Sequence, residues 1–229
     1  MRPLDIGIIG ALAAFFVAVE WVGNHGVFAG YMSAAGVVLI VAALQESHRL
    51  AFTDELTGLP SRRALEERLP ALGPVCTIAM ADVDHFKQFN DTHGHDIGDQ
   101  VLKLVAARLA EVGGGGVAYR YGGEEFCLIF DGCSAKEALP HVEACRAAIE
   151  DYTMAVRSEA RPPDTKSGSR LRGTSEAEAA GKTQKALSVT ASFGVAERSG
   201  ESRKPHDVIK AADEALYRAK KSGRNRVSK

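Results

Sequence analysis

Two long apolar runs near the start of the chain constrain its fold more than any other feature. Residues 6–22 are almost wholly apolar, with Glu20 near the end, and residues 27–44 contain no charged residue. Each run is close to the lower limit of about 17–20 residues that a helix needs to cross a bilayer. The tetrad Gly23-Asn24-His25-Gly26 between them is typical of a turn. The sequence therefore predicts a transmembrane helical hairpin within residues 1–45.

The charges around this hairpin predict its orientation. Arg2 precedes the first run, His48 and Arg49 follow the second, and the connecting turn carries no Lys or Arg. Because basic residues concentrate on the cytoplasmic side of membrane proteins, both ends of the hairpin are expected to lie in the cytoplasm.

Two alternatives to a membrane hairpin remain. A cleaved signal peptide has a basic start and one short apolar core, and both Asp5 and the second apolar run fit that pattern poorly. A helical hairpin inside a soluble protein is the other alternative. It is disfavoured because surface helices of soluble proteins carry a polar face, which both runs lack.

The rest of the chain alternates between strand and helix patterns. Residues 46–53 continue the second helix as a short stalk, and residues 54–229 form one α/β (α+β) domain with helices packed on a sheet. The expected strands are 75–81, 117–121, 126–130 and 187–196, and the expected helices are 62–69, 97–112, 134–151 and one that opens at Pro205 and is capped near Gly223. Residues 157–185 are polar and read as a solvated loop or an insertion.

Composition excludes two kinds of function. The net charge of −1 argues against a general binder of nucleic acid, whose surface is strongly basic. Cys76, Cys127, Cys133 and Cys145 show no paired spacing of the zinc type. We expect them to be free thiols in a reducing compartment.

The tract Arg120-Tyr121-Gly122-Gly123-Glu124-Glu125-Phe126 lies between two expected strands. Its glycines permit positive φ angles and have no Cβ, so a phosphate can approach the backbone closely. Its glutamates are costly to bury as free charges, so they face water, a cation or a metal. A solvated turn without function is the alternative from this tract alone.

A distant acidic residue gives the tract a candidate partner. Asp82 directly follows the expected buried strand 75–81. If that strand lies beside the two strands that flank the tract 120–126, its carboxylate meets Glu124 and Glu125 at one end of the sheet. Carboxylate oxygens are the ligands that Mg²⁺ or Mn²⁺ prefer, with water and phosphate completing the shell. The combination predicts a metal site that serves a phosphorylated ligand.

Separated motifs between Asp54 and Arg226 resemble the GGDEF domain of diguanylate cyclases, and they occur in that family's order. They are Asp54-x-Leu56-Thr57-Gly58-Leu59 with Arg62-Arg63; Asp82-Val83-Asp84-x-Phe86-Lys87; Phe89-Asn90-Asp91; Gly94-His95; Gly98-Asp99; the tract 120–126; Ser192-Phe193-Gly194-Val195-Ala196; and Asp213-x-Ala215-Leu216-Tyr217-x-Ala219-Lys220-x-x-Gly223-Arg224-Asn225.

The resemblance implies an activity and a metal set. Two GTP molecules would be joined into cyclic di-GMP with loss of pyrophosphate, and two domains must meet because each holds one GTP. Asp82, the carbonyl of Val83 and Glu124 correspond to the ligands of Mg²⁺ (or Mn²⁺). Glu125 lies beside them as a second catalytic carboxylate that orients the site or the attacking hydroxyl. The same resemblance places the domain in the cytoplasm, at the inner membrane of a bacterium.

Further positions correspond to substrate contacts. Asn90 and Asp99 look like the guanine readers, since both offer acceptors and Asn90 also offers a donor. Lys220 and Arg224, expected one helical turn apart on one face, suit the distal phosphates. Cations that merely stabilise a helix C-terminus are the alternative for that pair. Other expected substrate contacts are Lys87, Gly122 and Gly123.

Two departures from the family pattern matter. The tract 122–126 reads Gly-Gly-Glu-Glu-Phe, which is the GGEEF variant that active members use. Product-inhibited members carry Arg-x-x-Asp where this chain has Gly113 to Gly116. We therefore expect no primary product-inhibition site there. A domain that binds GTP or a protein partner without turnover is the alternative function, and a product receptor is disfavoured by the missing motif.

Overall fold

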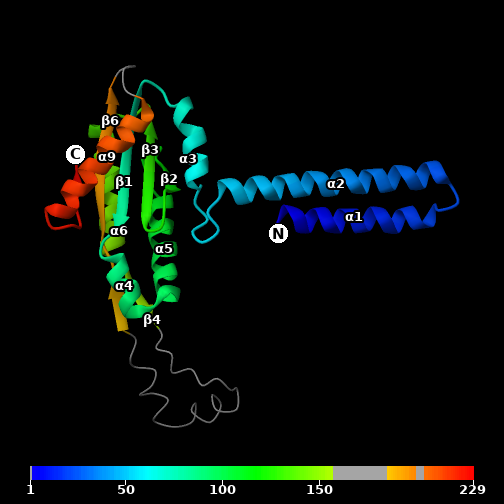
Figure 1. Cartoon of the computed structure of the whole chain (residues 1–229), viewed down its shortest axis with the longest axis horizontal. Coiled ribbons are helices and arrows are strands. Elements are labelled where there is room, and N and C mark those ends of the chain that lie inside the picture. The colour runs from blue at the N-terminus through cyan, green and yellow to red at the C-terminus, as the bar shows by residue number, and fades with distance from the viewer. Residues whose placement is uncertain (1, 157–184, 200–203) are drawn as a thin grey trace, which may run out of the picture.

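The computed structural model describes residues 2–156, 185–199 and 204–229, which form a helical hairpin joined to a globular domain (Figure 1). In chain order the elements are α1 (Pro3–Glu20), α2 (His25–Phe52), α3 (Arg62–Arg68), a 3-10 helix (Leu69–Ala71), β1 (Val75–Val83), α4 (Phe86–His93), α5 (His95–Ala110), β2 (Val117–Arg120), β3 (Glu125–Asp131), α6 (Ala135–Glu150), β4 (Thr153–Val156), β5 (Lys185–Ser188), β6 (Ala191–Ser199), α9 (Pro205–Lys221) and β7 (Val227–Ser228).

The central sheet confirms the expected α+β fold, and it is mostly antiparallel. Its strand order is β2-β3-β1-β6-β7. Strand β3 is antiparallel to both β2 and β1, and β1 is antiparallel to β6, whereas β7 runs parallel to β6. Strand β1 lies in the middle, and each of its residues after Val75 is buried. This explains why residues 75–81 read as a nearly continuous apolar run.

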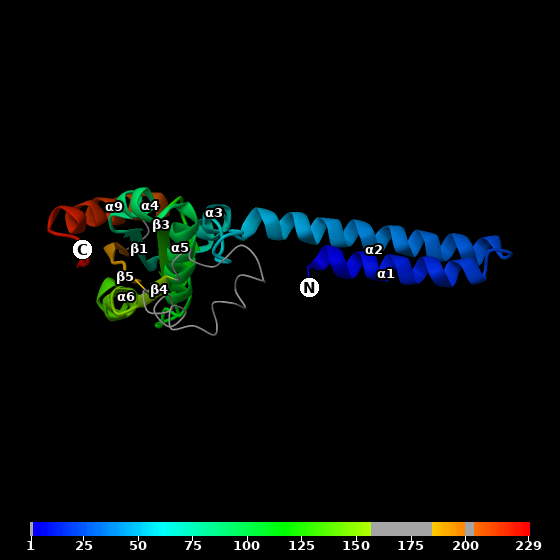
Figure 2. The ribbon, with the colours of Figure 1, turned by 90° about the horizontal axis from the view of Figure 1, so that it is seen from below.

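Helices cover both faces of the sheet (Figures 1 and 2). Alternate residues of β1 point to opposite faces. Ala79, Ala81 and Val83 pack with α5 and α6 in one cluster. Ile78 and Met80 pack with α3 and α9 in the other. By this alternation Asp82 lies on the face covered by α3 and α9.

Helix α9 lies very close to β6 because Gly194 has no side chain. A Cβ at that position would collide with the backbone nitrogen of Leu216 and the carbonyl oxygen of Ala212. Backbone atoms cannot move aside as a flexible side chain does, so this glycine sets the distance between helix and sheet. The C-terminal end of α9 is thereby fixed over the carboxyl end of β1.

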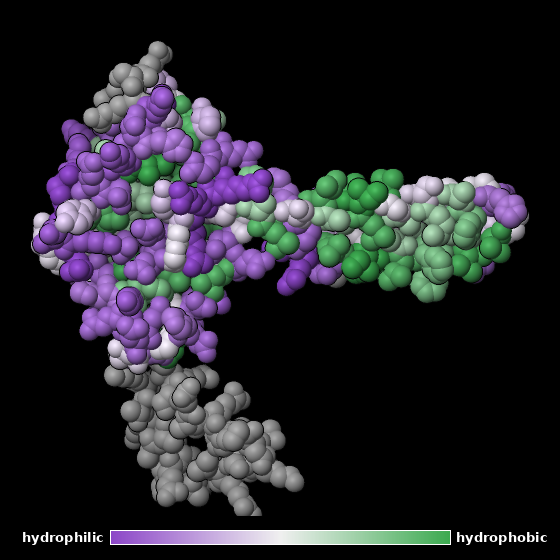
Figure 3. Space-filling view, in the orientation of Figure 1, coloured by the Kyte–Doolittle hydropathy of each residue, from purple (hydrophilic) through white to green (hydrophobic). Residues whose placement is uncertain are grey.

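Helices α1 and α2 pack antiparallel and project from the domain (Figures 1 and 2). Their surface is largely apolar, whereas the domain surface is mostly hydrophilic (Figure 3). Both are long and apolar enough to cross a membrane. Only 17% of the most apolar 18-residue stretch of α1 and 11% of that of α2 is buried. Such low burial differs from that of a core helix. Small residues fill their contact: Gly7, Ala11, Ala18, Ala35 and Ala42.

The structure differs from the sequence predictions at α4 and β5, and a third prediction falls outside the described residues. Helix α4 was not predicted, because residues 87–99 are too polar to show apolar periodicity. The expected strand 187–196 was wrong as a single element, since β5 leaves the main sheet and pairs with β4 in a second, two-stranded sheet. The expected insertion 157–185 lies outside the described residues except for Lys185.

Candidate active site

The carboxyl end of β1 brings acidic residues from two strands together. Asp82 and Glu125 are direct partners in the antiparallel pairing of β1 with β3, so both side chains lie on the face covered by α3 and α9. The backbone N–H of Val83 donates to the carbonyl oxygen of Glu124 at 3.3 Å. This bond ties the tip of the hairpin to the strand that carries Asp82.

Strands β2 and β3 are joined by a tight turn over Gly122 to Glu125. The N–H of Glu125 donates to the carbonyl oxygen of Gly122 at 3.3 Å, which closes the turn. The Arg120 guanidinium fixes its middle, because Nη2 donates to the carbonyl oxygen of Gly123 at 2.8 Å while Nη1 pairs with Asp54 at 2.7 Å. Glu124 and Glu125 are half-buried here.

The two glycines serve the turn differently from the prediction. Neither is among the described residues with positive φ, so left-handed backbone is not the reason for glycine at these positions. A Cβ on Gly122 would lie 3.2 Å from Oε2 of Glu125, and a Cβ on Gly123 would meet nothing within 4 Å. Gly122 therefore gives room to a carboxylate, and Gly123 leaves open space above the backbone.

Lys220, near the end of α9, is paired with Asp82. Its Nζ lies 2.8 Å from Oδ2 of Asp82, whose side chain is 7% exposed. Burial raises the pKa of Asp82, and the hydrogen bond from Lys220 offsets only part of that rise. Burial also raises the pKa of Glu124, and repulsion from Asp82 adds to it. Both raised pKa values mean that the two carboxyl groups lose their protons less readily than usual. The site therefore lacks the positive charge that would stabilise both as carboxylates.

The donor set fits a hard divalent cation. No group of three or more His, Cys, Asp or Glu side chains with metal-binding geometry occurs in the part of the chain that the structure describes. Two neighbouring carboxylates are nonetheless enough to hold Mg²⁺, since it takes most remaining ligands from water and substrate phosphate. The raised pKa values of Asp82 and Glu124 indicate the charge that such an ion would neutralise.

Lys220 and Arg224 do not share a helical face, and that prediction was wrong. Helix α9 ends at Lys221. Gly223 then takes φ 111°, and Arg224 and Asn225 follow at φ 62° and 46°, so the chain turns away from the helix axis. The N–H of Arg224 donates back to the carbonyl oxygen of Ala219 at 3.1 Å, which closes the helix end.

The expected guanine readers lie on the two helices that follow β1. Asn90 is on α4, and Asp99 is exposed on α5 beside Gly98. Oδ1 of Asn90 is buried without a hydrogen-bond partner among the described residues, and a Cβ on Gly98 would collide with it. A buried polar atom without a hydrogen-bond partner is unusual in a folded protein, and contact with a ligand is one explanation for it. Lys87 is exposed on α4.

Residues 113–116 form a turn without side chains. Gly114 and Gly115 have φ 65° and 72°, values that favour glycine. The imidazole of His141 lies against the turn, where a Cβ on Gly113 would be 2.9 Å from Nδ1. The positions at which the family resemblance leads us to expect Arg-x-x-Asp therefore present backbone and an imidazole ring.

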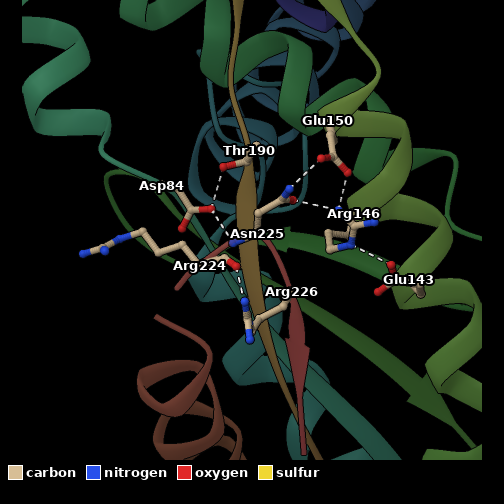
Figure 4. Close-up of polar contacts among 8 residues, drawn as sticks. All are labelled: Asp84, Glu143, Arg146, Glu150, Thr190, Arg224, Asn225 and Arg226. Carbon is tan, nitrogen blue, oxygen red and sulfur yellow. Dashed lines mark hydrogen bonds and ion pairs between the residues drawn. The ribbon is translucent and has the colours of Figure 1, made fainter. Parts of the chain in front are cut away.

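Sequence reasoning missed the roles of Asp54 and Asp84. Asp54 accepts from Thr57 and Arg120, and these bonds outweigh burial and lower its pKa. Asp84 is bonded to Ser192 and, as Figure 4 shows, to Thr190 and Asn225. Both aspartates stand in the motifs quoted above, but nothing local in the sequence names their distant partners.

Comparison with known proteins gives a consistent result. The sequence pattern of the family described as "Diguanylate cyclase, GGDEF domain" matches residues 51–183 and 169–226. The chain is 40% identical over 182 residues to "Diguanylate cyclase VdcA" of Vibrio cholerae, covering 77% of this chain and 46% of the relative. It is 37% identical over 192 residues to "Response regulator PleD" of Caulobacter vibrioides, covering 80% and 37%. The chain thus spans less than half the length of either relative.

Solved structures share the fold. The coiled coil and GGDEF domain of DgcB from Caulobacter crescentus, determined in complex with c-di-GMP, matches with a TM-score of 0.69 at 31% identity, over 86% of this chain and 94% of that one. Diguanylate cyclase SiaD from Pseudomonas aeruginosa, in complex with its activator SiaC, matches with a TM-score of 0.62 at 30% identity, over 97% of this chain and 83% of that one.

Proposed function

The chain belongs to the GGDEF-domain family of diguanylate cyclases, and on that premise we propose that it condenses two GTP molecules into cyclic di-GMP and two pyrophosphates. The 3′-hydroxyl of each GTP attacks the α-phosphorus of the other, and each attack expels one pyrophosphate. The observation that carries the proposal is the grouping of Asp82, Glu124 and Lys220 at the carboxyl end of β1. Carboxylates and a cation at one point are what a metal-bound triphosphate requires.

The chain's own residues bind and orient the nucleotide. Lys220 and Arg224 supply cations for the distal phosphates. The turn at Gly122 and Gly123 offers backbone close to the phosphates, and Lys87 adds a further cation. Asp99 accepts from the guanine N1–H and amine, while Asn90 offers its unpartnered oxygen and its amide donor.

The metal site of the proposal consists of Asp82, the carbonyl of Val83 and Glu124, with Mg²⁺ or Mn²⁺ as the ion. When bound there, the ion supplies positive charge that neutralises the phosphates and polarises the phosphorus–oxygen bonds. Glu125, opposite Asp82 on the neighbouring strand, orients the site or the attacking hydroxyl.

The proposal assigns each part of the chain a place. Each domain holds one GTP, so catalysis requires a homodimer whose two sites face each other. Residues 1–45 form the hairpin in the cytoplasmic membrane of a bacterium, 46–53 the stalk, and 54–229 the catalytic domain on the cytoplasmic side, where GTP is available. Two apolar helices with little burial support this arrangement.

The activity is tested with the purified full-length chain in detergent micelles, GTP and Mg²⁺. Formation of cyclic di-GMP is expected, and Asp82→Ala and Glu124→Gln are expected to reduce it to background. Glu143→Gln, on the surface of α6, is the matched control and is expected to keep the activity. Absence of product at every protein concentration would contradict the proposal, and GTP binding without product would favour a binding module.

A further inference from the structure

Asp84 is fully occupied by hydrogen bonds, although it lies two residues from the expected metal ligand Asp82. Its carboxylate accepts from Oγ1 of Thr190 at 2.7 Å, from Oγ of Ser192 at 2.7 Å and from the backbone N–H of Asn225 at 3.0 Å. The residue is 7% exposed. A buried carboxylate with three donors has its charge satisfied within the protein.

Asn225 is held from a second side by helix α6 (Figure 4). Its Nδ2 donates to Oε1 of Glu150 at 2.7 Å, and its Oδ1 accepts from Nη1 of Arg146 at 2.7 Å. Arg146 in turn bonds to Glu143 and Glu150, each at 2.6 Å. Helix α6 packs on the sheet face opposite α9, so this contact reaches the C-terminal segment from the far side of the sheet.

The segment that these contacts hold has an unfavourable backbone. Arg224 and Asn225 are consecutive residues with φ 62° and 46°, in the left-handed region. Left-handed backbone is unfavourable for a residue that carries a side chain, and Asn tolerates it better than most. Such a conformation persists where surrounding contacts fix it. Here the bonds to Asn225 from Asp84, Arg146 and Glu150 do so.

Arg224 is the residue whose direction this geometry sets. Its side chain extends past Asp84 in Figure 4 and is drawn without a side-chain partner there. Across the described residues its guanidinium has no hydrogen bond or ion pair, whereas its carbonyl oxygen accepts from Nε of Arg226 at 3.0 Å. The backbone is therefore fixed on both sides of a cation that remains available for a ligand.

We propose that Asp84, together with the Arg146–Glu150 contact to Asn225, is a positioning group that aims Arg224 at the phosphates of GTP. The inference rests on the proposed function and deepens it. It also separates the two aspartates of the Asp82-Val83-Asp84 motif: Asp82 faces Lys220, and Asp84 fixes the backbone that presents Arg224.

A double-mutant cycle tests the coupling. The full-length protein is titrated calorimetrically with a GTP analogue that lacks the 3′-hydroxyl, in the presence of Mg²⁺, so that binding is measured without turnover. Asp84→Asn is expected to weaken binding about tenfold, a loss within the range seen for coupled neighbours. In the Arg224→Ala background the same change is expected to cost less than about twofold, because no cation remains to be aimed.

A matched pair on α6 repeats the test far from the nucleotide. Glu150→Ala removes a carboxylate that holds both Arg146 and Asn225, whereas Glu143→Ala removes one that holds only Arg146. Glu150→Ala is expected to weaken analogue binding about threefold, in the lower part of the coupling range, and Glu143→Ala to leave it unchanged. If Asp84→Asn fails to fold, as judged by thermal unfolding, the comparison of Glu150→Ala with Glu143→Ala tests the positioning role instead.

The outcomes separate this inference from the proposed function. Equal losses from Asp84→Asn with and without Arg224, or equal effects of the two α6 variants, would overturn the positioning role while leaving GTP binding intact. An unchanged affinity in Arg224→Ala would overturn it as well. If the wild-type chain does not bind the analogue at all, the proposed function itself fails.

Discussion

Two aspartates that look alike in sequence have different environments in the structure. Asp82 and Asp84 both follow the same apolar run, and the sequence alone does not rank them. Asp82 pairs with Lys220 and keeps a raised pKa, which marks it as a site for added positive charge. Asp84 instead accepts three hydrogen bonds. Partners, rather than residue type, decide which carboxylate serves a ligand.

Stabilisation by Mg²⁺ is expected to depend on pH. Asp82 and Glu124 both have raised pKa values in the folded protein, so without metal they stabilise the fold at low pH and lose that effect as the pH rises through those values. A bound cation reverses this, because it binds the ionised forms. Saturating Mg²⁺, at about 100 times its Kd, should raise the free energy of unfolding by about 2.7 kcal/mol near neutral pH, and by little near the pKa of an ordinary carboxyl.

Thermal unfolding of the full chain in micelles, with and without Mg²⁺ between about pH 4 and pH 8, measures this effect. Asp82→Asn should remove the dependence, and Glu143→Gln should keep it. A Mg²⁺ effect of equal size at all pH values would contradict the assignment of these two carboxylates.

Lys220 is expected to compete with the metal for Asp82. Its ammonium group lies 2.8 Å from the carboxylate, so a cation must displace it, whereas phosphates attract it away. An opposite charge this close to a carboxylate is worth about 1–3 pKa units, and Mg²⁺ must replace that interaction when it binds Asp82. Because Lys220→Met removes the competing charge, it should tighten Mg²⁺ binding about tenfold in the absence of nucleotide. The same variant should bind the 3′-deoxy analogue more weakly.

Lys221→Met is the control, because Lys221 is the exposed neighbouring residue and lies over Tyr217. Unchanged Mg²⁺ affinity in Lys220→Met would refute the competition.

At the scale of elements, one ion pair joins the segment after α2 to the turn 122–125. Asp54 lies two residues beyond the end of α2. It pairs with Arg120, which also donates to the carbonyl oxygen of Gly123 in the turn. Ser61 strengthens the connection, since its hydroxyl donates to the carbonyl oxygen of Ala51 in the last turn of α2. The end of α2 and the turn 122–125 are thus joined by hydrogen bonds through Ser61 and Asp54.

Loss of this ion pair should slow catalysis more than it weakens binding. Arg120→Ala frees Gly123 and leaves Asp54 half-buried without its charged partner, which costs about 1.5–3 kcal/mol of unfolding free energy. The turnover rate should fall about tenfold, since a small displacement of reacting groups has large effects, while the affinity for the 3′-deoxy analogue changes little. Arg68→Ala breaks a more exposed pair with Asp131 and serves as control. An equal effect of both variants on turnover would contradict the special role of Arg120.

The glycine turn between α5 and β2 predicts how the product acts. Gly113 to Gly116 offer no charged side chain, so cyclic di-GMP has no Arg or Asp to bind there. Product should therefore compete with GTP without lowering the maximal rate. Initial rates at several GTP and product concentrations measure this. Strong non-competitive inhibition, mapped to this surface by protection from hydrogen exchange, would refute the prediction.

At the scale of the whole molecule, an apolar hairpin projects from a hydrophilic domain (Figure 3). The hairpin buries few of its large side chains, and its exposed residues include Phe16, Trp21, Val37, Ile40 and Leu44. An apolar surface of this extent is unfavourable in water and favourable in lipid. The hairpin and the domain therefore suit different solvents.

Removal of the hairpin should release the domain into solution. The full chain should co-sediment with phospholipid vesicles and resist extraction by high salt, whereas residues 46–229 should remain in the supernatant. Activity of this fragment should rise steeply with its concentration, because the proposed reaction needs two domains. Extraction of the full chain by salt alone would show a peripheral association, and activity per molecule that is independent of concentration would contradict the dimer.

The sequence by itself determined the apolar hairpin, the strands β1, β2 and β3, the helices α3, α5, α6 and α9, and the motifs that resemble the GGDEF family. These are local features, because periodicity, turn residues and residue type are written within short windows. The polar residues of α4 show no such periodicity. Residues 187–196 favour strand throughout, so the sequence does not indicate that the chain divides there into β5 and β6.

Only the tertiary structure decided which side chains meet. The pairing of Asp82 with Lys220, the position of Arg224 beyond the end of α9 and the contact of Asp84 with Asn225 join residues far apart in the chain. Their geometry depends on how closely α9 approaches the sheet at Gly194 and on where α6 holds the C-terminal segment. Such contacts follow from packing between elements, which no local pattern specifies.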